Sequence, residues 1–292
     1  MRGWRFIFFI CLVFCLSSLS VFSQDLGRIL CLENAIPTYH YKTSSKKEVS
    51  KKLEVVDHKY FKLGYYEKHE QSAWVAYLLT KEMVSETKAT RKNRFTIDNK
   101  ISTLSAKSSD YAKSGYDRGH ICPAADMSFS QDAQDRTFLM SNMSPQTHSF
   151  NAGKWKQLED KVRKWAIEND SIIVIAGPIL DSIISKIGEN NVSIPYSFYK
   201  IIIDISYPDF KAIGFIMKNE KLSEDLIYYS MSIREIEDRT GLNFFPKYDK
   251  DSLVQNLETK VWDWGLKPSI KKTTTIKTNK PKTNAKKAKK GN

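Results

Sequence analysis

The chain has 292 residues, of which 41% are hydrophobic, including 15 phenylalanines, 14 tyrosines and six tryptophans. This length and composition allow one large or two small domains with a sizeable core, and they exclude an intrinsically disordered protein. The net charge of +13 is concentrated in residues 267–292, which contain ten lysines and no acidic residue. When the charges of that segment and of Arg2 and Arg5 are left out, the net charge is about +1. The rest of the chain, residues 24–266, is therefore close to neutral.

Residues 1–23 are predicted to be a signal peptide. Arg2 and Arg5 form a positive segment, residues 6–16 are an unbroken apolar run, and small and polar residues follow as far as Ser23. This layout is typical of secretory signals that are cleaved near that point. The alternative is an uncleaved membrane anchor, but the run is short for a span of about 20 residues. We therefore expect a secreted or periplasmic protein without stable membrane insertion after cleavage.

Residues 24–53 are interpreted as a leader, because they contain Pro37 and a basic polar stretch without a clear period. Regular structure is expected from about Leu53. Residues 60–66 alternate in part between apolar and polar side chains. Residues 74–80 predict a strand that is apolar on both faces and therefore lies in the interior of a sheet. Residues 93–110 look like a loop, and residues 116–122 enter a short strand or turn.

Residues 151–169 have helical spacing, with Trp155, Leu158, Val162 and Trp165 on one buried face. Residues 171–180 predict a buried strand. Residues 199–205 and 210–217 predict a strand pair joined by a turn at 207–209, and residues 222–237 predict a helix followed by a loop. The expected fold is one α+β domain over residues 54–266, in which helices flank a central antiparallel sheet. A disordered lysine-rich tail, residues 267–292, is expected to follow.

Residues 116–163 contain side chains suited to phosphodiester hydrolysis. That reaction needs a base for water, a cation for the developing charge and help for the leaving oxygen. His120 titrates in the range of a suitable base, and the neighbouring Arg118 can clamp phosphate oxygens. Asn151 and Glu159 offer the oxygen ligands that Mg²⁺ prefers. With Arg163 they are spaced by eight and four residues, which places them on nearly the same face of a helix.

This part of the chain resembles the DNA/RNA non-specific endonucleases of the ββα-metal, DRGH type. Three motifs carry the resemblance: D-R-G-H at 117–120, N-x-x-P-Q at 142–146 and N-x-x-x-W-x-x-L-E at 151–159. They occur in order and with suitable spacing, and weaker matches at 74–77, 194–200 and 240–246 flank them. The resemblance covers most of residues 55–265 and implies a ββα-metal active-site motif.

The resemblance implies metal-dependent hydrolysis of DNA and RNA without sequence specificity, leaving 5′-phosphate ends. His120 would be the general base. Asn151 would be the direct protein ligand of Mg²⁺, or of another divalent cation such as Mn²⁺. Glu159 would act through the water shell of that ion.

Other family positions would support this chemistry. The resemblance implies that Asn142 orients the site by hydrogen bonding, that Asp117 braces the motif, and that Arg118 and Arg163 neutralise the transition state. The family also has an arginine upstream of an aromatic residue and an aspartate. Arg91 and Arg94 both precede Phe95 and Asp98, and we favour Arg91.

Each of these residues also has a simpler structural explanation. His120 taken alone would be a core histidine, Asn151 a helix N-cap, and Glu159 with Arg163 an exposed ion pair. The three motifs together favour the functional interpretation. Asp126 is interpreted as a turn residue, and His148 is given no role.

The alternative function is a catalytically silent nucleic-acid-binding protein on the same fold, which loss of His120 or Asn151 would have signalled. A hydrolase of nucleotides or other phosphodiesters is a third possibility. The lysine-rich tail either holds phosphate backbones or only confers solubility. Cys31 and Cys122 either form a disulfide, which export permits, or are separate thiols. The sequence does not indicate an oligomeric state.

Overall fold

The computed structural model describes residues 37–39, 53–204, 210–248 and 250–268. The predicted signal peptide, most of the leader with Cys31, and nearly all of the lysine-rich tail lie outside these residues. Among the described residues, no helix is both long and apolar enough to cross a membrane.

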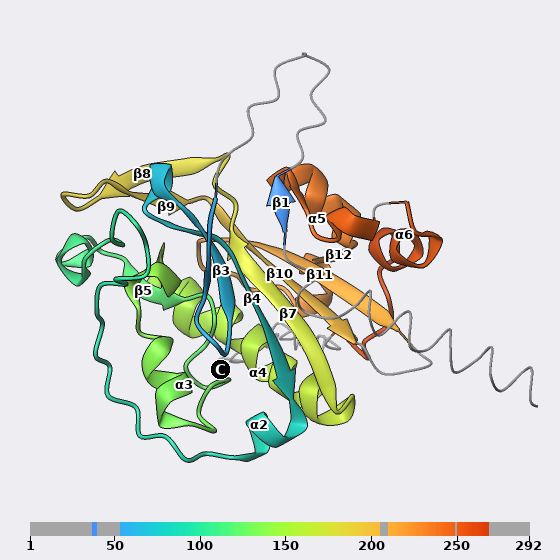
Figure 1. Ribbon diagram of the computed structural model, residues 1–292. Coiled ribbons are helices and arrows are strands. Elements are labelled where there is room, and N and C mark those ends of the chain that lie inside the picture. Colours follow the sequence, from blue (N-terminus) through green and yellow to red (C-terminus); the bar gives the residue numbers. More distant parts are fainter. Residues whose placement is uncertain (1–36, 40–52, 205–209, 249, 269–292) are drawn as a thin grey trace, which may run out of the picture.

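A seven-stranded antiparallel sheet forms the centre of the described part of the chain (Figure 1). Its strand order is β12-β11-β10-β7-β4-β3-β2. The strands are β2 (Glu54–Asp57), β3 (Lys62–Tyr66), β4 (Gln71–Thr80), β7 (Ser171–Pro178), β10 (Ser197–Asp204), β11 (Lys211–Lys218) and β12 (Ser230–Met231). The predicted interior position of residues 74–80 is confirmed, because β4 lies between β3 and β7.

The two faces of the sheet pack against different helices. Side chains of β4 alternate between two cores: Val75 and Tyr77 belong to one, and Trp74 and Ala76 belong to the other. Helix α4 (Lys156–Glu168) covers the first face, and α5 (Ile233–Thr240) and α6 (Ser252–Thr259) cover the second. Burial of both faces explains why β4, β7 and β10 are nearly continuous apolar sequences. The predicted α+β fold, a central antiparallel sheet flanked by helices, is confirmed.

Shorter elements complete the fold, and most of them escaped the sequence analysis. Three two-stranded pairs are β1 (Thr38–Tyr39) with β13 (Leu242–Asn243), β5 (Asp117–His120) with β6 (Met143–Gln146), and β8 (Ile183–Ile187) with β9 (Val192–Pro195). Helix α2 (Lys81–Ser85) follows β4, and α3 (Gln131–Arg136) precedes β6. The 3₁₀ turns are Glu67–His69, Ser108–Tyr111, Met140–Asn142, Leu226–Tyr229 and Pro246–Tyr248.

The predicted helix over residues 151–169 is present, but it begins differently. A π-helical segment, Phe150–Trp155, precedes α4, and Gly153 interrupts it with φ −100° and ψ −115°. Asn151 lies inside this segment, so its interpretation as a helix N-cap is wrong. The predicted apolar stripe of Trp155, Leu158, Val162 and Trp165 is buried. π-Helical turns are frequent at functional sites.

The prediction of a helix followed by a loop over residues 222–237 is also wrong, because the order is reversed. Helix α5 begins only after Ser232, whose hydroxyl accepts a hydrogen bond from the Glu235 amide at 3.3 Å. The Glu235 carboxylate accepts from the Ser232 amide at 2.9 Å. The helix ends at Gly241, which has φ 69°. This capping box and the terminal glycine define the helix better than the diffuse apolar pattern before residue 230.

Ser232→Ala should therefore lower the free energy of unfolding by about 1 kcal/mol, because it removes the side-chain cap of α5. Chemical denaturation of the purified protein measures this change. Ser223→Ala is the matched control, since Ser223 is exposed and precedes the helix. Equal stability of the two variants would contradict the assignment of Ser232 as the cap.

Candidate active site

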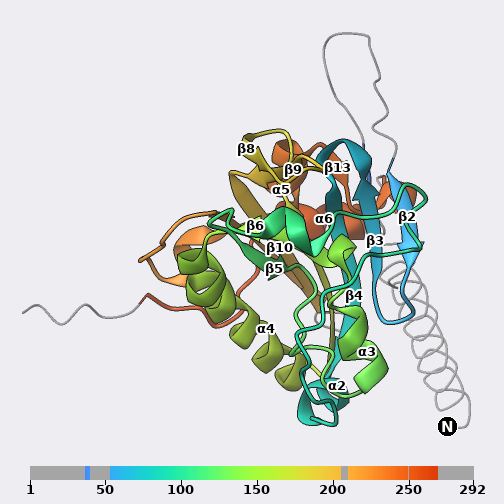
Figure 2. The same ribbon diagram turned by 90° about the vertical axis from the view of Figure 1, so that its left-hand side faces the viewer.

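Two of the three motifs meet in a small antiparallel ribbon. Strand β5 is the D-R-G-H motif, and it pairs with β6, which comes from the N-x-x-P-Q motif. In the register, His120 faces Met143 and Asp117 faces Gln146. A Cβ atom added to Gly119 would lie 2.2 Å from the Gln146 side chain, so this position requires glycine for close approach. Figure 2 shows β5 and β6 beside α4, which carries the third motif.

Asn142 fixes the chain directly after His120. Its buried side chain accepts a hydrogen bond from the Cys122 amide at 2.9 Å and donates to the Cys122 carbonyl at 3.0 Å. It also donates to the Thr137 carbonyl at 2.8 Å. All of these contacts are made to backbone groups, so Asn142 holds the chain on both sides of the turn after His120, and its role in orienting the site stays a prediction.

His120 is held between aromatic rings. The Phe138 ring packs edge-on against the imidazole at 4.8 Å between centroids, and the Phe95 ring lies at 6.0 Å. The Nε2 atom is buried and has no hydrogen-bond partner among the described residues. Burial, together with the nearby charge of Arg91, lowers the pKa of His120 to about 3. The imidazole is therefore uncharged near neutral pH, as a general base requires, but its pKa lies well below the near-neutral range expected from the sequence, and an anionic phosphate beside the ring would raise it.

Two arginines lie close to this ring system. Arg91 stacks over Phe138 at 5.3 Å and donates to the Asn93 side chain at 2.7 Å. Arg118 lies 5.3 Å from the Phe95 ring centroid and donates to the Ser108 carbonyl at 2.7 Å. Within the described part of the chain, Arg94 makes no comparable contact with these rings. The preference for Arg91 over Arg94 is thus consistent with its position beside the ring that packs on His120.

Asp117 joins the β5 strand to the third motif. One of its carboxylate oxygens, Oδ2, accepts a hydrogen bond from Asn151 Nδ2 at 2.9 Å. The same oxygen lies 2.9 Å from Nδ1 of His148, a residue that received no role from the sequence. Because Asn151 uses its amide nitrogen in this contact, its carbonyl oxygen remains without a hydrogen bond among the described residues. The contact places Asp117 where it can hold the Asn151 amide, and the roles of Asp117 as a brace and of Asn151 as a metal ligand stay predictions.

Arg163 does not form the simple exposed pair with Glu159 that the spacing allowed. Its guanidinium donates to Asp126 Oδ1 at 2.6 Å and also forms an ion pair with Asp160. Asp126 lies in the predicted turn, where its amide donates to the Pro123 carbonyl. However, its carboxylate is buried and also accepts from the Tyr77 hydroxyl at 2.8 Å. This second role could not be predicted, because no residue near Asp126 in the sequence indicates which distant side chains reach it.

Glu159 has no hydrogen bond to its carboxylate among the described residues. Burial raises its pKa to about 7, Lys200 and Arg163 oppose the rise, and Asp126 adds to it. A bound cation would favour the charged form. Lys200 lies in a segment that matched the family only weakly, and its complete burial was not anticipated.

These donors fit a hard divalent cation with a largely aqueous shell. In the described residues, no three His, Cys, Asp or Glu side chains come together in a way that could hold a metal ion. A cation here would instead use the uncommitted carbonyl oxygen of Asn151, with Glu159 acting through water. Mg²⁺ keeps several waters and takes few protein oxygens, so this donor set suits it.

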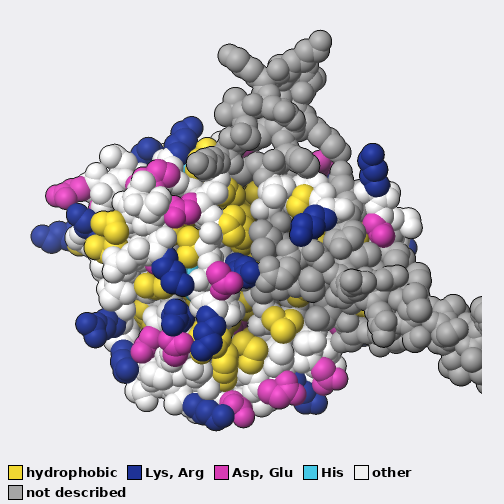
Figure 3. Space-filling model, in the orientation of Figure 1, with side chains coloured by type: hydrophobic (Ala, Val, Ile, Leu, Met, Phe, Trp, Pro, Cys, Tyr) yellow, Lys and Arg dark blue, Asp and Glu magenta, His cyan; other side chains and the backbone are white. Residues whose placement is uncertain are grey.

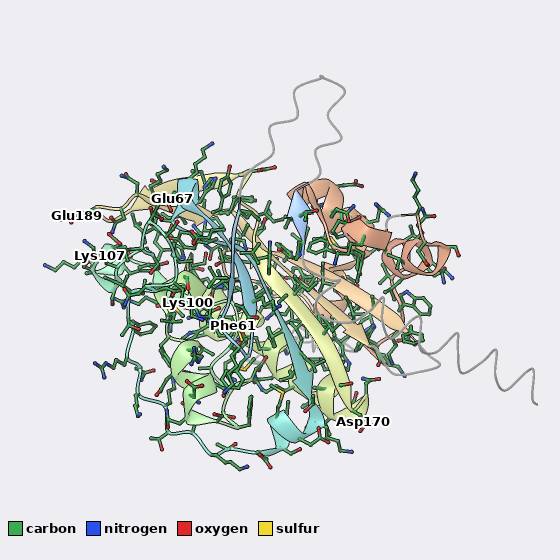
Figure 4. All side chains as sticks on the ribbon, viewed as in Figure 1. Phe61, Glu67, Lys100, Lys107, Asp170 and Glu189 are labelled. Atoms are coloured by element: carbon green, nitrogen blue, oxygen red, sulfur yellow. The ribbon has the colours of Figure 1, made fainter. Side chains whose placement is uncertain are left out.

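Two further features border this site. Cys122 is buried, and its possible disulfide partner Cys31 is outside the described residues. A hollow of about 250 Å³ is lined by residues of the 108–111 turn and of the β8–β9 hairpin. Figure 4 shows Lys107 and Glu189 at this edge. The Asp110 carboxylate there accepts hydrogen bonds from the Lys107 amide at 2.7 Å and from the Asn190 side chain at 2.8 Å.

The visible surface of the body carries both signs of charge. Figure 3 shows Lys and Arg side chains interspersed with Asp and Glu side chains. This mixture agrees with the near-neutral body expected from the sequence.

Known proteins share both the sequence and the fold. The family model described as DNA/RNA non-specific endonuclease matches residues 37–251. The mitochondrial nuclease EXOG of Danio rerio is 32% identical over 209 residues, which cover 65% of this chain and 60% of the relative. A nuclease of Nostoc sp. is 29% identical over 213 residues, which cover 69% of this chain and 76% of the relative.

A solved structure of EndoG in complex with EndoGI superimposes with a TM-score of 0.63 and 29% identity, covering 67% of this chain and 87% of that chain. The chain spans less than two thirds of the EXOG relatives, 60% of the Danio rerio protein and 55% of the human one. The matched range nevertheless contains all three motifs and nearly the whole sheet. On this evidence, the chain belongs to the DNA/RNA non-specific endonuclease family.

Proposed function

We propose that this chain is a metal-dependent endonuclease that hydrolyses the phosphodiester bonds of DNA and RNA without sequence preference and leaves 5′-phosphate ends. One observation supports it above the others. Strand β5 carries an uncharged imidazole at His120 and, three residues earlier, the carboxylate that holds Asn151. Strand pairing and the Asp117–Asn151 hydrogen bond hold the imidazole and the Asn151 amide on adjoining elements, and we infer that one bound phosphate lies between them.

In this proposal His120 accepts the proton of the attacking water. Its ring is fixed by Phe138, and Asn142 anchors the backbone that follows it. A divalent cation such as Mg²⁺ or Mn²⁺, bound at Asn151, supplies positive charge to the phosphate oxygens and to the leaving group. Asp117 keeps the Asn151 amide turned so that its carbonyl oxygen is available.

The arginines contribute in two ways. Arg91 and Arg118 lie against the aromatic rings around His120, where a guanidinium can hold phosphate oxygens. Arg163 is bound to Asp126 and Asp160, and its charge stabilises the carboxylates near Glu159 as well as the transition state. Contacts to phosphate carry no sequence information, which accounts for low specificity.

His120→Ala should reduce cleavage of plasmid DNA and of RNA in the presence of Mg²⁺ by at least about 100-fold, because the general base is lost. Cleavage rates on agarose gels and circular dichroism measure activity and folding separately. Lys164→Ala is the control, since Lys164 is exposed on α4. Nucleic acid binding without cleavage by the folded parent protein would instead support a silent binding protein.

The Mg²⁺ requirement should depend on pH through Glu159. A carboxyl with a pKa of about 7 is largely ionised at pH 8 and largely protonated at pH 6. The contribution of Glu159 to Mg²⁺ binding is therefore present above pH 7 and is lost below it. The half-saturating Mg²⁺ concentration should rise up to about tenfold between pH 8 and pH 6. Glu159→Gln should bind Mg²⁺ more weakly and with little pH dependence. If the half-saturating Mg²⁺ concentration depended on pH equally in the parent and in Glu159→Gln, a group other than Glu159 would control Mg²⁺ binding.

We also propose that residues 1–23 direct export, on the basis of the positive and apolar segments described above. The mature protein recovered outside the cytoplasm should begin near Gln24. N-terminal sequencing of protein from the medium or the periplasm tests this. Recovery of the full-length chain in the cytoplasm alone would contradict export.

A further inference from the structure

Asn219 is a buried residue at the end of β11, and its side-chain amide is fully hydrogen-bonded. It is 4% exposed and directly follows Lys218, the last residue of that strand. Its Nδ2 atom donates to the Pro145 carbonyl at 3.0 Å and to the Pro195 carbonyl at 3.1 Å. Its Oδ1 atom accepts from the Thr147 amide at 2.8 Å. Both donor hydrogens and the acceptor oxygen of this amide are therefore in use.

These contacts join the β5–β6 ribbon to the central sheet. Among the described strands, the ribbon is a two-stranded pair of its own, separate from the seven-stranded sheet. Pro145 lies on β6, opposite Arg118, whereas Asn219 continues from β11 of the large sheet. A second link of this kind is the hydrogen bond from the Ser144 hydroxyl to the Gln71 side chain of β4, at 2.6 Å. Side-chain hydrogen bonds thus hold the ribbon on the sheet.

The link at Asn219 continues into the segment that carries Asn151. The Thr147 hydroxyl donates to the Asn219 carbonyl at 3.3 Å, in addition to the contact of the Thr147 amide. The Thr147 carbonyl accepts from the Phe150 amide at 3.1 Å and from the Asn151 amide at 2.9 Å. The main chain of Asn151 is therefore connected to Asn219 through a single intervening residue.

This segment is irregular, so its first residues need contacts from outside. The first amides of a helix have no carbonyl partner within the helix, and Gly153, two residues after Asn151, has non-helical backbone angles. Asp117 holds the Asn151 side-chain amide, but rotation about the side-chain bonds leaves the main chain free to move. The main chain and the side chain of Asn151 are thus held separately, the first through Thr147 and the second by Asp117.

We propose that Asn219 is a positioning residue for the hydrolytic reaction, because its amide fixes Thr147 and thereby the main chain of Asn151. This inference rests on the proposed nuclease function, in which Asn151 binds the divalent cation. In this role Asn219 touches neither the substrate nor the cation. It determines where the Asn151 carbonyl oxygen lies relative to the ribbon that carries His120.

The first experiment compares Mn²⁺ binding by Asn219→Ala and by the parent, using electron paramagnetic resonance at a temperature well below unfolding. The dissociation constant for Mn²⁺ should rise at least about tenfold, because residues that orient a metal ligand affect metal affinity to this extent. Cleavage of duplex DNA at low Mg²⁺ should fall with it and should recover in part at high Mg²⁺. Equal Mn²⁺ affinity in the two folded proteins would overturn the proposal.

Thr147→Val tests the same connection with less disturbance to the fold, and it serves if Asn219→Ala does not fold. It removes the hydroxyl that donates to the Asn219 carbonyl, and it keeps the main-chain amide and nearly the same side-chain volume. The dissociation constant for Mn²⁺ should rise roughly threefold, since a single hydrogen bond is lost. A dissociation constant equal to that of the parent would contradict the connection from Asn219 to Asn151.

Asn243→Ala is the matched control for loss of a buried asparagine. Asn243 is also buried, and its Oδ1 atom accepts from a main-chain amide, that of Phe245, at 3.0 Å. It lies on β13, where the neighbouring Leu242 packs in the core beneath α5. Asn243→Ala should lower the unfolding temperature and leave Mn²⁺ affinity unchanged. If Asn219→Ala gave the same result, Asn219 would have only a structural role.

Hydrogen exchange followed by NMR measures the position of the Asn151 main chain without metal or substrate. In metal-free Asn219→Ala, the Asn151 amide should exchange at least about tenfold faster than in the parent, beyond the change seen for the amides of β7, which report global unfolding. A change no larger than that of β7 would overturn the role of Asn219 even in an active nuclease. A parent that binds no Mn²⁺ and cleaves no nucleic acid would instead refute the proposed function, and this role with it.

Discussion

The site depends on the hydrogen bond between Asp117 and Asn151. The three motifs lie on separate elements: β5, its partner β6, and the π-helical segment that leads into α4. The first two are joined by strand pairing. The 2.9 Å contact between the Asp117 carboxylate and the Asn151 amide joins the third to them. It orients the amide as well, because using the nitrogen as donor leaves the oxygen available for a cation.

The polar and charged side chains around this hydrogen bond lower the stability of the fold. Among the described residues, the buried His120 Nε2 has no hydrogen-bond partner. The pKa of Glu159 is raised to about 7, and the Lys200 ammonium group is buried over the Trp155 ring. Each is less favourable for stability than an apolar residue in the same place. Departures from simple core rules concentrate at functional sites, and these three side chains lie on β5, α4 and β10. The face of the sheet covered by α5 and α6 also has buried carboxylates near it, but there Arg234 pairs with both Glu237 and Glu258.

Local patterns predicted most of the framework. The apolar sequence of residues 74–80 indicated an interior strand, and the Trp155 to Trp165 stripe indicated the helix that covers it. The motifs indicated His120, Asp117 and Asn151 because each is part of a contiguous, recognisable segment. The order within residues 222–237 differs from the prediction because the Ser232 and Glu235 capping pair starts the helix late in this segment. The contacts of Asp126 and the burial of Lys200 escaped prediction for a different reason. Their partners are distant in sequence, and only the packed sheet brings them together.

The proposed reaction requires an uncharged imidazole and a hydrated cation to act on the same phosphate. The most direct measurement is a crystal structure of the protein with Mn²⁺ and a phosphorothioate oligonucleotide that resists cleavage, using the anomalous signal to locate the ion. We expect one Mn²⁺ on the Asn151 carbonyl oxygen, with a phosphate between the ion and the His120 ring. An ion bound elsewhere, or a phosphate on a surface that the His120 ring does not reach, would contradict it.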